Sequence, residues 1–295
     1  MHGILPLWKP KGMTSHDCVV RIRRLFKTKK VGHTGTLDPE VEGILPICIG
    51  QATKIVPFLT DTKKTYIAEL KLGWSTETED DQGEIIERKP VTDFPTEETV
   101  DNVLQSFKGE ITQIPPMYSA VKVNGRKLYE YARKNLEVER PKRSVTIFEI
   151  ERISLQEEKI RFKVVCSKGT YIRTLCVNIG EKLGYPAHMS DLCRTQTGSF
   201  DEKDGLSFTE IEEAVMNQKE EQLLCPLLRG VDHLDELQVD ESIKRKVENG
   251  RKLEKPEQPI KTDPFRVMHG RELLAIYQNH PEKNGQIKPV RVFQV

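Results

Sequence analysis

Apolar residues recur at helical spacing near the start of the chain. Five of them fall on one face of a segment that Ser15 can cap and that has Asp17 in its first turn: Cys18, Val19, Ile22, Leu25 and Phe26. Three lysines are expected in the last turn, where the helix dipole favours positive charge: Lys27, Lys29 and Lys30. The pattern therefore predicts an amphipathic helix over about residues 15–30.

Similar spacing predicts five more helices, over residues 51–59, 96–106, 127–136, 170–184 and 208–216. Thr96 and Thr209 are expected to cap two of them, and Gly109 and Gly184 are expected to stop two. Pro57 weakens the prediction for the second half of the first of these helices. The helix over 127–136 is expected to be basic and amphipathic.

Strands are predicted where apolar residues alternate or form short runs. Residues 66–72 alternate, residues 44–49 form an apolar run, and residues 145–154 and 159–167 are expected to pair. A loop leads into a strand over residues 190–199. Three short strands are expected near the end of the chain, after a proline-rich connection, over residues 265–268, 272–277 and 290–295.

These elements predict an α+β fold with a mixed, mostly antiparallel sheet flanked by helices. We expect a main domain over residues 1–230 and a small, mostly-β domain over residues 231–295. With 295 residues, of which 37% are hydrophobic and 31% charged, the chain can bury a core of ordinary size. No apolar run is long enough to cross a membrane and no signal-peptide pattern is present, so a cytoplasmic protein is expected.

Cysteine and histidine spacing gives no metal signature. The six cysteines include no Cys-x-x-Cys pair and are expected to be free, mostly buried thiols. The seven histidines include no His-Glu-x-x-His motif. We therefore expect no metal.

Charge is distributed unevenly, although the net charge is only +1. Residues 1–37 carry eight Lys/Arg and one acidic residue, and residues 117–144 carry eight Lys/Arg and three acidic residues. Residues 74–110 have a net charge of −8, and residues 201–241 have a net charge of −10. A basic patch on an otherwise acidic protein would attract a polyanion to one face, but solvated helix faces would give the same charge pattern.

Asp38 is the first candidate for chemistry. Gly32 and Gly35 allow unusual backbone angles just before it, and Pro39 biases it away from the helical region, so its carboxylate can project from a fixed loop. Asp-Pro is also a common turn pair. The residues alone leave both interpretations open.

Four ordered blocks give a resemblance to a known family. Residues 32–39 (GHTGTLDP), with residues 43–50 (GILPICIG) after them, resemble the signature of the tRNA pseudouridine-55 synthases, the TruB family. Three further blocks resemble those of the same family, at residues 9–15 (KPKGMTS), 115–122 (PPMYSAVK) and 167–175 (SKGTYIRTL). The resemblance covers about residues 3–200 and implies the pseudouridine synthase fold.

The resemblance implies a role for each matching residue. Asp38 matches the catalytic aspartate, as nucleophile or general base, and Arg173 matches the arginine that pairs with it. Tyr66 matches the tyrosine that stacks on the target base. Around the same base the resemblance places Tyr171 at the pocket edge, Leu192 beneath the flipped base and His33 in the gap that the base leaves. The reaction is an isomerisation, so no cofactor or metal is expected.

The partner implied by the resemblance is the T-arm stem-loop of tRNA, with no guide RNA and with the protein acting as a monomer. Basic residues are expected to contact RNA: Lys9 in the first block, Lys122, Arg126, Arg133 and Lys134 in a thumb-like insertion, and the cations of residues 21–30. The small C-terminal domain is expected to be a PUA-like RNA-binding domain.

Two other functions stay open at this point. One is an RNA chaperone of the same ancestry without activity, which the complete set of Asp38, Tyr66 and Arg173 disfavours. The other is a nucleic-acid N-glycoside hydrolase, which would also use a carboxylate and a flipped base. A guide-dependent relative is a third arrangement, and activity on bare tRNA would exclude it.

Overall fold

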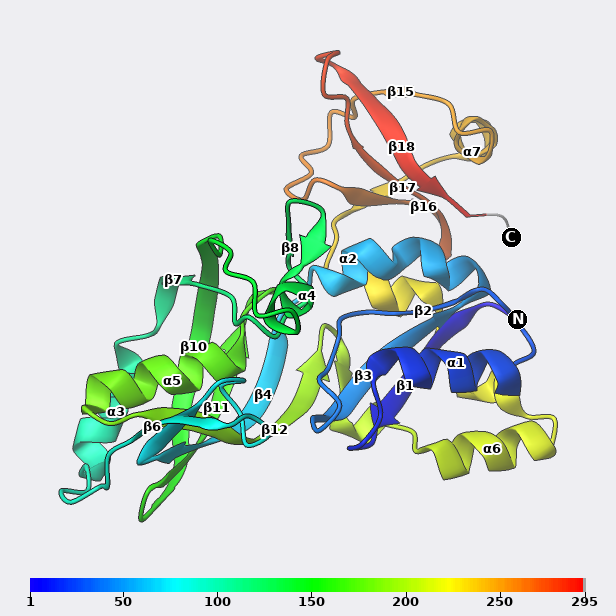
Figure 1. Ribbon diagram of the computed structural model, residues 1–295. Helices are drawn as coiled ribbons and strands as arrows, with labels where there is room; N and C mark the ends of the chain where they lie inside the picture. The colour runs from blue at the N-terminus through cyan, green and yellow to red at the C-terminus, as the bar shows by residue number, and fades with distance from the viewer. Residues whose placement is uncertain (294–295) are drawn as a thin grey trace. The chain divides into compact units, whose positions relative to one another are not determined.

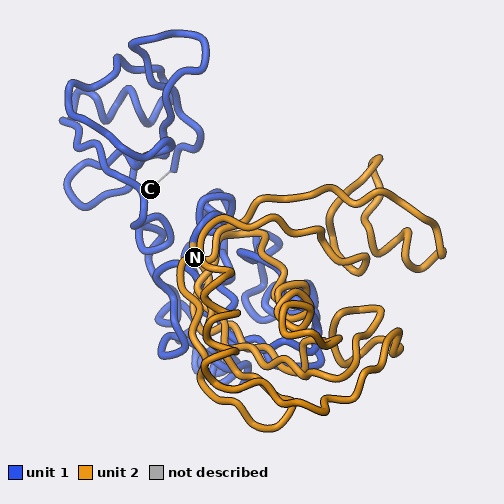
Figure 2. The backbone as a smooth tube through the Cα atoms, turned by 90° about the vertical axis from the view of Figure 1, so that its left-hand side faces the viewer, with its two compact units in different colours: residues 1–62, 197–295 blue, residues 63–196 orange. Residues whose placement is uncertain are grey.

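The computed structural model describes residues 1–293, and its contacts divide the chain into two compact units (Figure 2). Unit 1 joins Met1–Thr62 to Thr197–Val295, and unit 2 is Lys63–Gln196. The chain thus leaves unit 1, builds all of unit 2 and returns. The mixture of helices and mostly antiparallel strands in both units confirms the predicted α+β class. The expected domain boundary at residue 230 stays a prediction.

Three antiparallel strands form the N-terminal part of unit 1. Strand β3 (Glu42–Ile49) pairs with β1 (Gly3–Lys9) on one side and with β2 (Val31–His33) on the other. The apolar residues of β1 and β3 are almost all fully buried, which explains why these strands show a continuous apolar run rather than alternation. In this register Lys9 lies opposite Gly43, and His33 lies opposite Ile47.

Helix α1 (Ser15–Leu25) connects β1 to β2 and lies along β2 (Figure 1). The prediction of its cap was wrong by one residue: Thr14 is the N-cap, and it forms a reciprocal capping box with Asp17. The helix ends at Leu25, so the three lysines at 27, 29 and 30 follow it instead of occupying its last turn. Lys27 itself has a positive φ of 48°, which ends the helix.

Short helices follow β3 in the same unit. Residues 51–59 were expected to be one helix, but they form a 3₁₀ turn, η1 (Gly50–Ile55), and then α2 (Val56–Thr60). Pro57 lies in the first turn of α2, where its missing N–H is tolerated. After the chain returns from unit 2, it forms β13 (Phe200–Asp201), η2 (Glu202–Asp204), α6 (Phe208–Met216), η3 (Glu220–Leu223) and η4 (Leu227–Val231). Ser207, not Thr209, caps α6.

A five-stranded sheet of order β14-β16-β17-β18-β15 forms the last part of unit 1. Its strands are β14 (Glu236–Gln238), β15 (Leu253–Glu254), β16 (Phe265–His269), β17 (Glu272–Asn279) and β18 (Gln286–Val292). The expectation of a C-terminal β domain is confirmed, but the sequence pattern missed helix α7 (Glu241–Glu248). Ile276 and Phe293 belong to the same buried cluster as Ile4 and Ile55, so this sheet shares a core with the beginning of the chain.

Unit 2 is built on a sheet of order β12-β4-β11-β10-β7. Its strands are β4 (Lys64–Leu72), β7 (Gly109–Gln113), β10 (Arg143–Gln156), β11 (Lys159–Cys166) and β12 (Ala187–Thr197). The predicted pairing of β10 with β11 is confirmed. Helices α3 (Glu97–Gln105) and α5 (Ile172–Leu183) contact each other (Figure 1), and Thr96 and Gly184 cap them as predicted. A separate hairpin joins β5 (Trp74–Thr76) to β6 (Ile85–Arg88).

The prediction of a long basic helix over residues 127–136 was wrong. A hairpin of β8 (Lys122–Val123) and β9 (Arg126–Lys127) ends at the first residue of this segment, and only Leu128–Ala132 is helical, as α4. The reason is local: Asn124 and Gly125 both have positive φ, as a tight two-residue hairpin turn requires, and Asn135 has a φ of 50° just after the helix.

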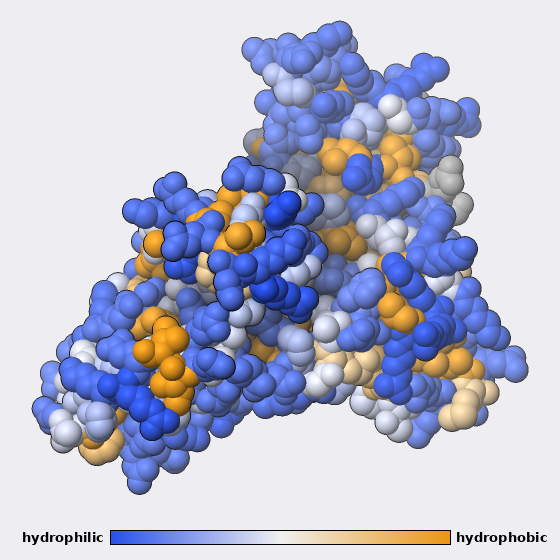
Figure 3. Space-filling view, viewed as in Figure 1, coloured by the Kyte–Doolittle hydropathy of each residue, from blue (hydrophilic) through white to orange (hydrophobic). Residues whose placement is uncertain are grey.

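Hydrophilic residues predominate on the face shown in Figure 3, with small separate hydrophobic patches. Four of the six cysteines are buried and two are half-buried, and all are free thiols, as predicted. Within residues 1–293, no helix is long and apolar enough to span a membrane.

Candidate active site

The loop that carries Asp38 is held by a buried lysine. Lys9 is fully buried at the end of β1, and its ammonium group donates hydrogen bonds to the carbonyl oxygens of Pro39 at 3.0 Å and Val41 at 2.7 Å. A third bond, to the carbonyl oxygen of Pro10, measures 2.9 Å. Since a buried ammonium must be fully hydrogen-bonded, these carbonyl oxygens give Lys9 a structural role beside Asp38. The prediction that Lys9 also contacts RNA stays a prediction.

Helix α1 holds the other side of the loop. The Ser15 hydroxyl accepts from the Leu37 N–H at 2.9 Å, and it lies 3.1 Å from the Leu37 carbonyl oxygen, to which it donates. The Gly12 N–H donates to the Pro39 carbonyl oxygen at 2.9 Å. Leu37 itself is buried, so the residue before Asp38 is fixed by packing as well as by hydrogen bonds. The blocks at residues 9–15 and 32–39 thus meet around Asp38.

His33 lies at the end of β2, five residues before Asp38. Thr34, which follows it, is fully buried, and both its N–H and its hydroxyl donate to the Pro46 carbonyl oxygen. This double contact ties the start of the loop to β3, and it fixes where the His33 backbone leaves the sheet. His33 is half-buried.

In unit 2, Arg173 lies in the first turn of α5 and is buried. Its guanidinium donates to the carbonyl oxygens of Thr78 and Tyr118, both at 2.9 Å, and it lies 3.6 Å from a carboxylate oxygen of Asp80. A planar fork with several donors suits two carbonyl acceptors at once. The blocks at residues 115–122 and 167–175 therefore meet at Arg173.

Tyr171 is the N-cap residue of α5, and a side chain from β7 holds its backbone. Gln113 accepts from the Tyr171 N–H at 3.0 Å through its side-chain oxygen and donates to the Tyr171 carbonyl oxygen at 3.1 Å. Gln113 is buried. These two hydrogen bonds to one residue fix the backbone two positions before Arg173.

Tyr66 and Leu192 are buried on neighbouring strands of the unit 2 sheet. Tyr66 lies on β4 opposite Val164 of β11, and Leu192 lies on β12, which follows β4 in the strand order. Both side chains are nearly inaccessible, with exposures of 9% and 7%. The structure therefore brings these two predicted base contacts onto adjacent strands.

The predicted thumb residues are exposed, as phosphate contacts must be. Lys122 and Arg126 lie on the β8–β9 hairpin, and Arg133 and Lys134 follow α4. The guanidinium of Arg133 lies 5.4 Å from the ring centre of Tyr129, and the ammonium of Lys127 lies 5.3 Å from it. These two cation–π contacts give the ring a positive environment, which suits a contact with RNA.

Not all of the cations at residues 21–30 are available for RNA. Arg21 forms a salt bridge with Glu212 and lies over the ring of Phe208, and Arg23 donates to the Val31 carbonyl oxygen. Four others are exposed: Arg24, Lys27, Lys29 and Lys30. Only these four match the expectation of phosphate contacts.

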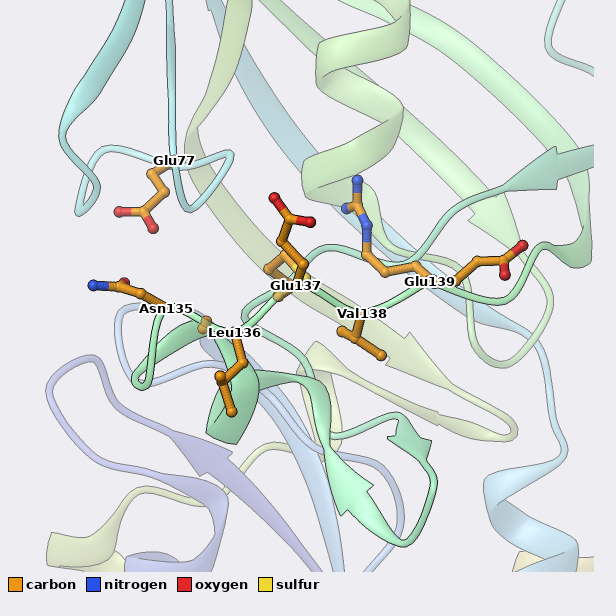
Figure 4. Close-up of a pocket in the computed structure, with 9 residues that line it drawn as sticks. Glu77, Asn135, Leu136, Glu137, Val138 and Glu139 are labelled. Carbon is orange, nitrogen blue, oxygen red and sulfur yellow. The ribbon is translucent and has the colours of Figure 1, made fainter.

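A pocket of about 690 Å³ lies beside the thumb segment (Figure 4). Glu77 comes from the chain just after β5, and the other labelled side chains come from the segment after α4. Apolar residues line it together with Asn135, three acidic residues (Glu77, Glu137 and Glu139) and one basic residue, Arg140. Because the acidic residues outnumber the single arginine, the pocket does not favour a phosphate group.

Family models match most of the chain. A model described as the N-terminal domain of TruB family pseudouridylate synthase matches residues 23–172, and a model of the tRNA pseudouridylate synthase B C-terminal domain matches residues 173–234. The chain belongs to the TruB family. Among its relatives in this family, a protein named tRNA pseudouridine synthase B from Oceanobacillus iheyensis is 63% identical, over 100% of this chain and 98% of its own length.

Other proteins are similar over nearly the whole of this chain. The Bacillus subtilis protein named tRNA pseudouridine synthase B is 54% identical over 99% of this chain and 97% of its own. A solved Cbf5-Nop10-Gar1 complex contains a chain with a TM-score of 0.78 and 29% identity, over 99% of this chain and 84% of that one. An H/ACA RNP bound to a substrate RNA containing 2′-deoxyuridine gives a TM-score of 0.77 and 26% identity, over 99% of this chain and 85% of that one.

The sequence analysis missed the residues that support the predicted site residues. Ser15 was expected to cap a helix, while Gln113, Glu79 and Asp80 were not singled out. No local pattern marks them, because each acts on a residue that is far away in the sequence. A weak signal was present only for Lys9, as a charged residue at the end of an apolar run.

Proposed function

We propose that this protein converts uridine 55 in the T-loop of tRNA to pseudouridine, with Asp38 as the catalytic carboxylate. The observation that supports it best is the way the matching blocks assemble. Residues 9–15 and 32–39 meet around the Asp38 loop, and residues 115–122 and 167–175 meet around Arg173. Relatives that cover the whole chain and are named tRNA pseudouridine synthase B support tRNA as the substrate.

The proposed reaction breaks the N-glycosidic bond, rotates the uracil and joins its C5 to the ribose. An ionised Asp38 starts it, by attacking the sugar or the base or by removing a sugar proton. The C5 proton is then lost and a proton returns to N1, so that atoms and charge balance without a co-reactant. We propose that Arg173 acts as the cation that keeps the carboxylate ionised in a dry site.

Uridine must leave the stacked loop before it can react. In the proposal, Tyr66 offers its ring face to the flipped uracil, Leu192 supports the base and Tyr171 lines the edge of its pocket. His33 occupies the gap left in the RNA, which recovers part of the lost stacking. The burial of Tyr66 and Leu192 suits contacts with a base that has been withdrawn from water.

Affinity for RNA comes from exposed cations in this proposal. Lys122, Arg126, Arg133 and Lys134 contact phosphates, and so do the exposed cations at residues 24–30. The protein acts as a monomer on tRNA alone in the cytoplasm, without a guide RNA, and a PUA-like C-terminal domain adds further RNA contacts.

The test is tritium release from a bare tRNA transcript labelled at uracil C5, with pure protein and EDTA. Release that matches label loss at one T-loop uridine, with no free uracil, supports the isomerase. Free uracil would identify the hydrolase instead. Tight tRNA binding without release would favour the chaperone, and release that requires an added guide RNA would favour the guide-dependent relative.

A further inference from the structure

The turn between β5 and β6 contacts the first turn of α5 at two successive residues. Thr78 offers its carbonyl oxygen to Arg173 at 2.9 Å, and Asp80 places a carboxylate oxygen 3.6 Å from the same guanidinium. Between them, Glu79 accepts a 2.6 Å hydrogen bond from the hydroxyl of Thr174. Three successive turn residues thus hold two successive helix residues.

The backbone of Glu79 has a conformation that residues other than glycine rarely adopt. Its φ is +65°, in the left-handed region. Its carbonyl oxygen accepts from the Met189 N–H of β12 at 3.0 Å, and Asp80 forms an isolated bridge with Met189. A strained residue persists only where its surroundings over-determine it, and such residues cluster at functional sites.

The Glu79 carboxyl group is largely removed from water. Burial raises its pKa, while the Thr174 hydroxyl and the guanidinium groups of Arg173 and Arg140 act in the opposite direction. Thr174 is itself buried, with 7% exposure. A carboxylate in such a place is costly unless it is well hydrogen-bonded, so the bond to Thr174 is the contact that fixes the side chain.

We propose that Glu79 is a positioning residue for Arg173, acting through the Thr174 hydroxyl. The bond between Glu79 and Thr174 holds the turn against α5, and this position places the Thr78 carbonyl oxygen and the Asp80 carboxylate at the guanidinium. Without that bond the strained turn relaxes, and the guanidinium keeps its contact with the Tyr118 carbonyl oxygen but loses the support of the turn. This inference rests on the proposed function, in which Arg173 serves the chemical step.

Displacement of this turn should slow catalysis but should not weaken tRNA binding. The exposed cations that are proposed to bind RNA lie on other elements, so tRNA affinity is unaffected by the position of this turn. A small displacement of a catalytic group costs about ten- to a hundredfold in rate. We therefore expect kcat to fall by about tenfold or more and the Kd for tRNA to stay unchanged.

The experiment measures single-turnover rate, kcat and tRNA Kd for four single variants at Glu79 and Thr174, one double variant and one control variant. Glu79→Ala and Thr174→Val each remove the hydrogen bond. Glu79→Gln and Thr174→Ser each keep it, through an amide oxygen and a hydroxyl. The double variant Glu79→Ala/Thr174→Val completes a double-mutant cycle on kcat. Glu110→Ala is the matched control, because it removes an exposed bond from the Ser144 hydroxyl to a glutamate.

We expect Glu79→Ala and Thr174→Val to have equally low kcat values, and the double variant to be no slower than either. Glu79→Gln and Thr174→Ser should keep most of the wild-type rate. A wild-type kcat in Thr174→Val would overturn the inference. So would additive losses of kcat in the double-mutant cycle, or low rates in Glu79→Gln and Thr174→Ser. Should Glu79→Ala fail to fold, the two threonine variants decide the question. An inactive wild type would instead refute the proposed function, which separates the two failures.

Discussion

The ammonium nitrogen of Lys9 lies 2.7 Å from the carbonyl oxygen of Val41, and it also bonds the carbonyl oxygen of Pro39. Lys9 thereby ties the end of β1 to the backbone on the C-terminal side of Asp38. A fully buried lysine on a strand end would be costly without these acceptors. The contact makes the position of the Asp38 loop depend on a residue about thirty positions earlier.

Lys9→Met should slow the reaction and destabilise the fold. Methionine has similar length but removes the ammonium donor, and of the Pro39 and Val41 carbonyl oxygens Pro39 keeps a bond from the Gly12 N–H. The loss costs about 1.5 to 3 kcal/mol in free energy of unfolding. The measurements are urea unfolding, kcat and tRNA affinity. Lys11→Met is the control, since Lys11 is exposed in the same block. Unchanged stability and rate in Lys9→Met would show that the loop does not need this support.

Asp38→Asn should abolish turnover and leave tRNA affinity within about threefold, because cations and not carboxylates supply most of the binding to RNA. Tritium release and filter binding measure the two quantities. Glu40→Gln removes an exposed carboxylate two residues later and should leave both unchanged. A near-normal rate in Asp38→Asn would remove Asp38 from the mechanism.

Arg173→Ala should reduce the rate by about tenfold or more, because the predicted pairing with Asp38 would lose its cation. Without the cation the pKa of Asp38 rises, so the acid limb of the pH–rate profile should move to higher pH. Arg173→Lys keeps the charge but lacks the fork that reaches the carbonyl oxygens of Thr78 and Tyr118 together, so its rate should be intermediate. A profile unchanged across pH would contradict the pairing.

Arg133→Ala combined with Lys134→Ala should weaken tRNA binding and flatten its dependence on salt. Each phosphate contact that is lost lowers the slope of log K against log salt by about one unit or less. Binding is measured from 50 to 300 mM KCl (about the range over which counterion release is resolved). Lys203→Ala combined with Lys219→Ala removes the same charge from exposed sites of unit 1. Equal slopes for the two double variants would argue against a thumb that binds RNA.

Glu79→Gln should change how stability depends on pH. Burial raises the pKa of Glu79 in the folded state above its ordinary value of 4.5, so the folded state holds this proton more tightly than the unfolded state. Its contribution is fully present below pH 4.5 and is lost as the pH rises through the folded pKa. Relative to the wild type, Glu79→Gln should therefore gain stability as the pH rises. Urea unfolding at intervals between pH 4 and 8 (about the range where carboxyl groups titrate) measures this, and a constant difference would refute it.

Local patterns predicted most of the α-helices and the longer strands of unit 2 correctly. The caps of α3 and α5, the β10–β11 pair and the C-terminal strands follow from short-range signals such as Thr96, Gly184 and apolar alternation. The failures were also local. The turn at Asn124 and Gly125 was overlooked in a segment whose charge and apolar spacing favoured a helix, and Thr14 was passed over for Ser15 as the cap of α1.

The sequence by itself determined the candidate residues, because Asp38 and Arg173 lie in blocks whose residue types and order are specific, and Tyr66 matches the family between those blocks. Only the tertiary structure decided what holds them. Ser15 could cap a helix by its sequence position, yet its hydroxyl bonds Leu37, 22 residues away. Glu79 supports α5 across 95 residues. Hydrogen bonds between distant segments depend on how strands and helices pack, and no spacing along the chain records that packing.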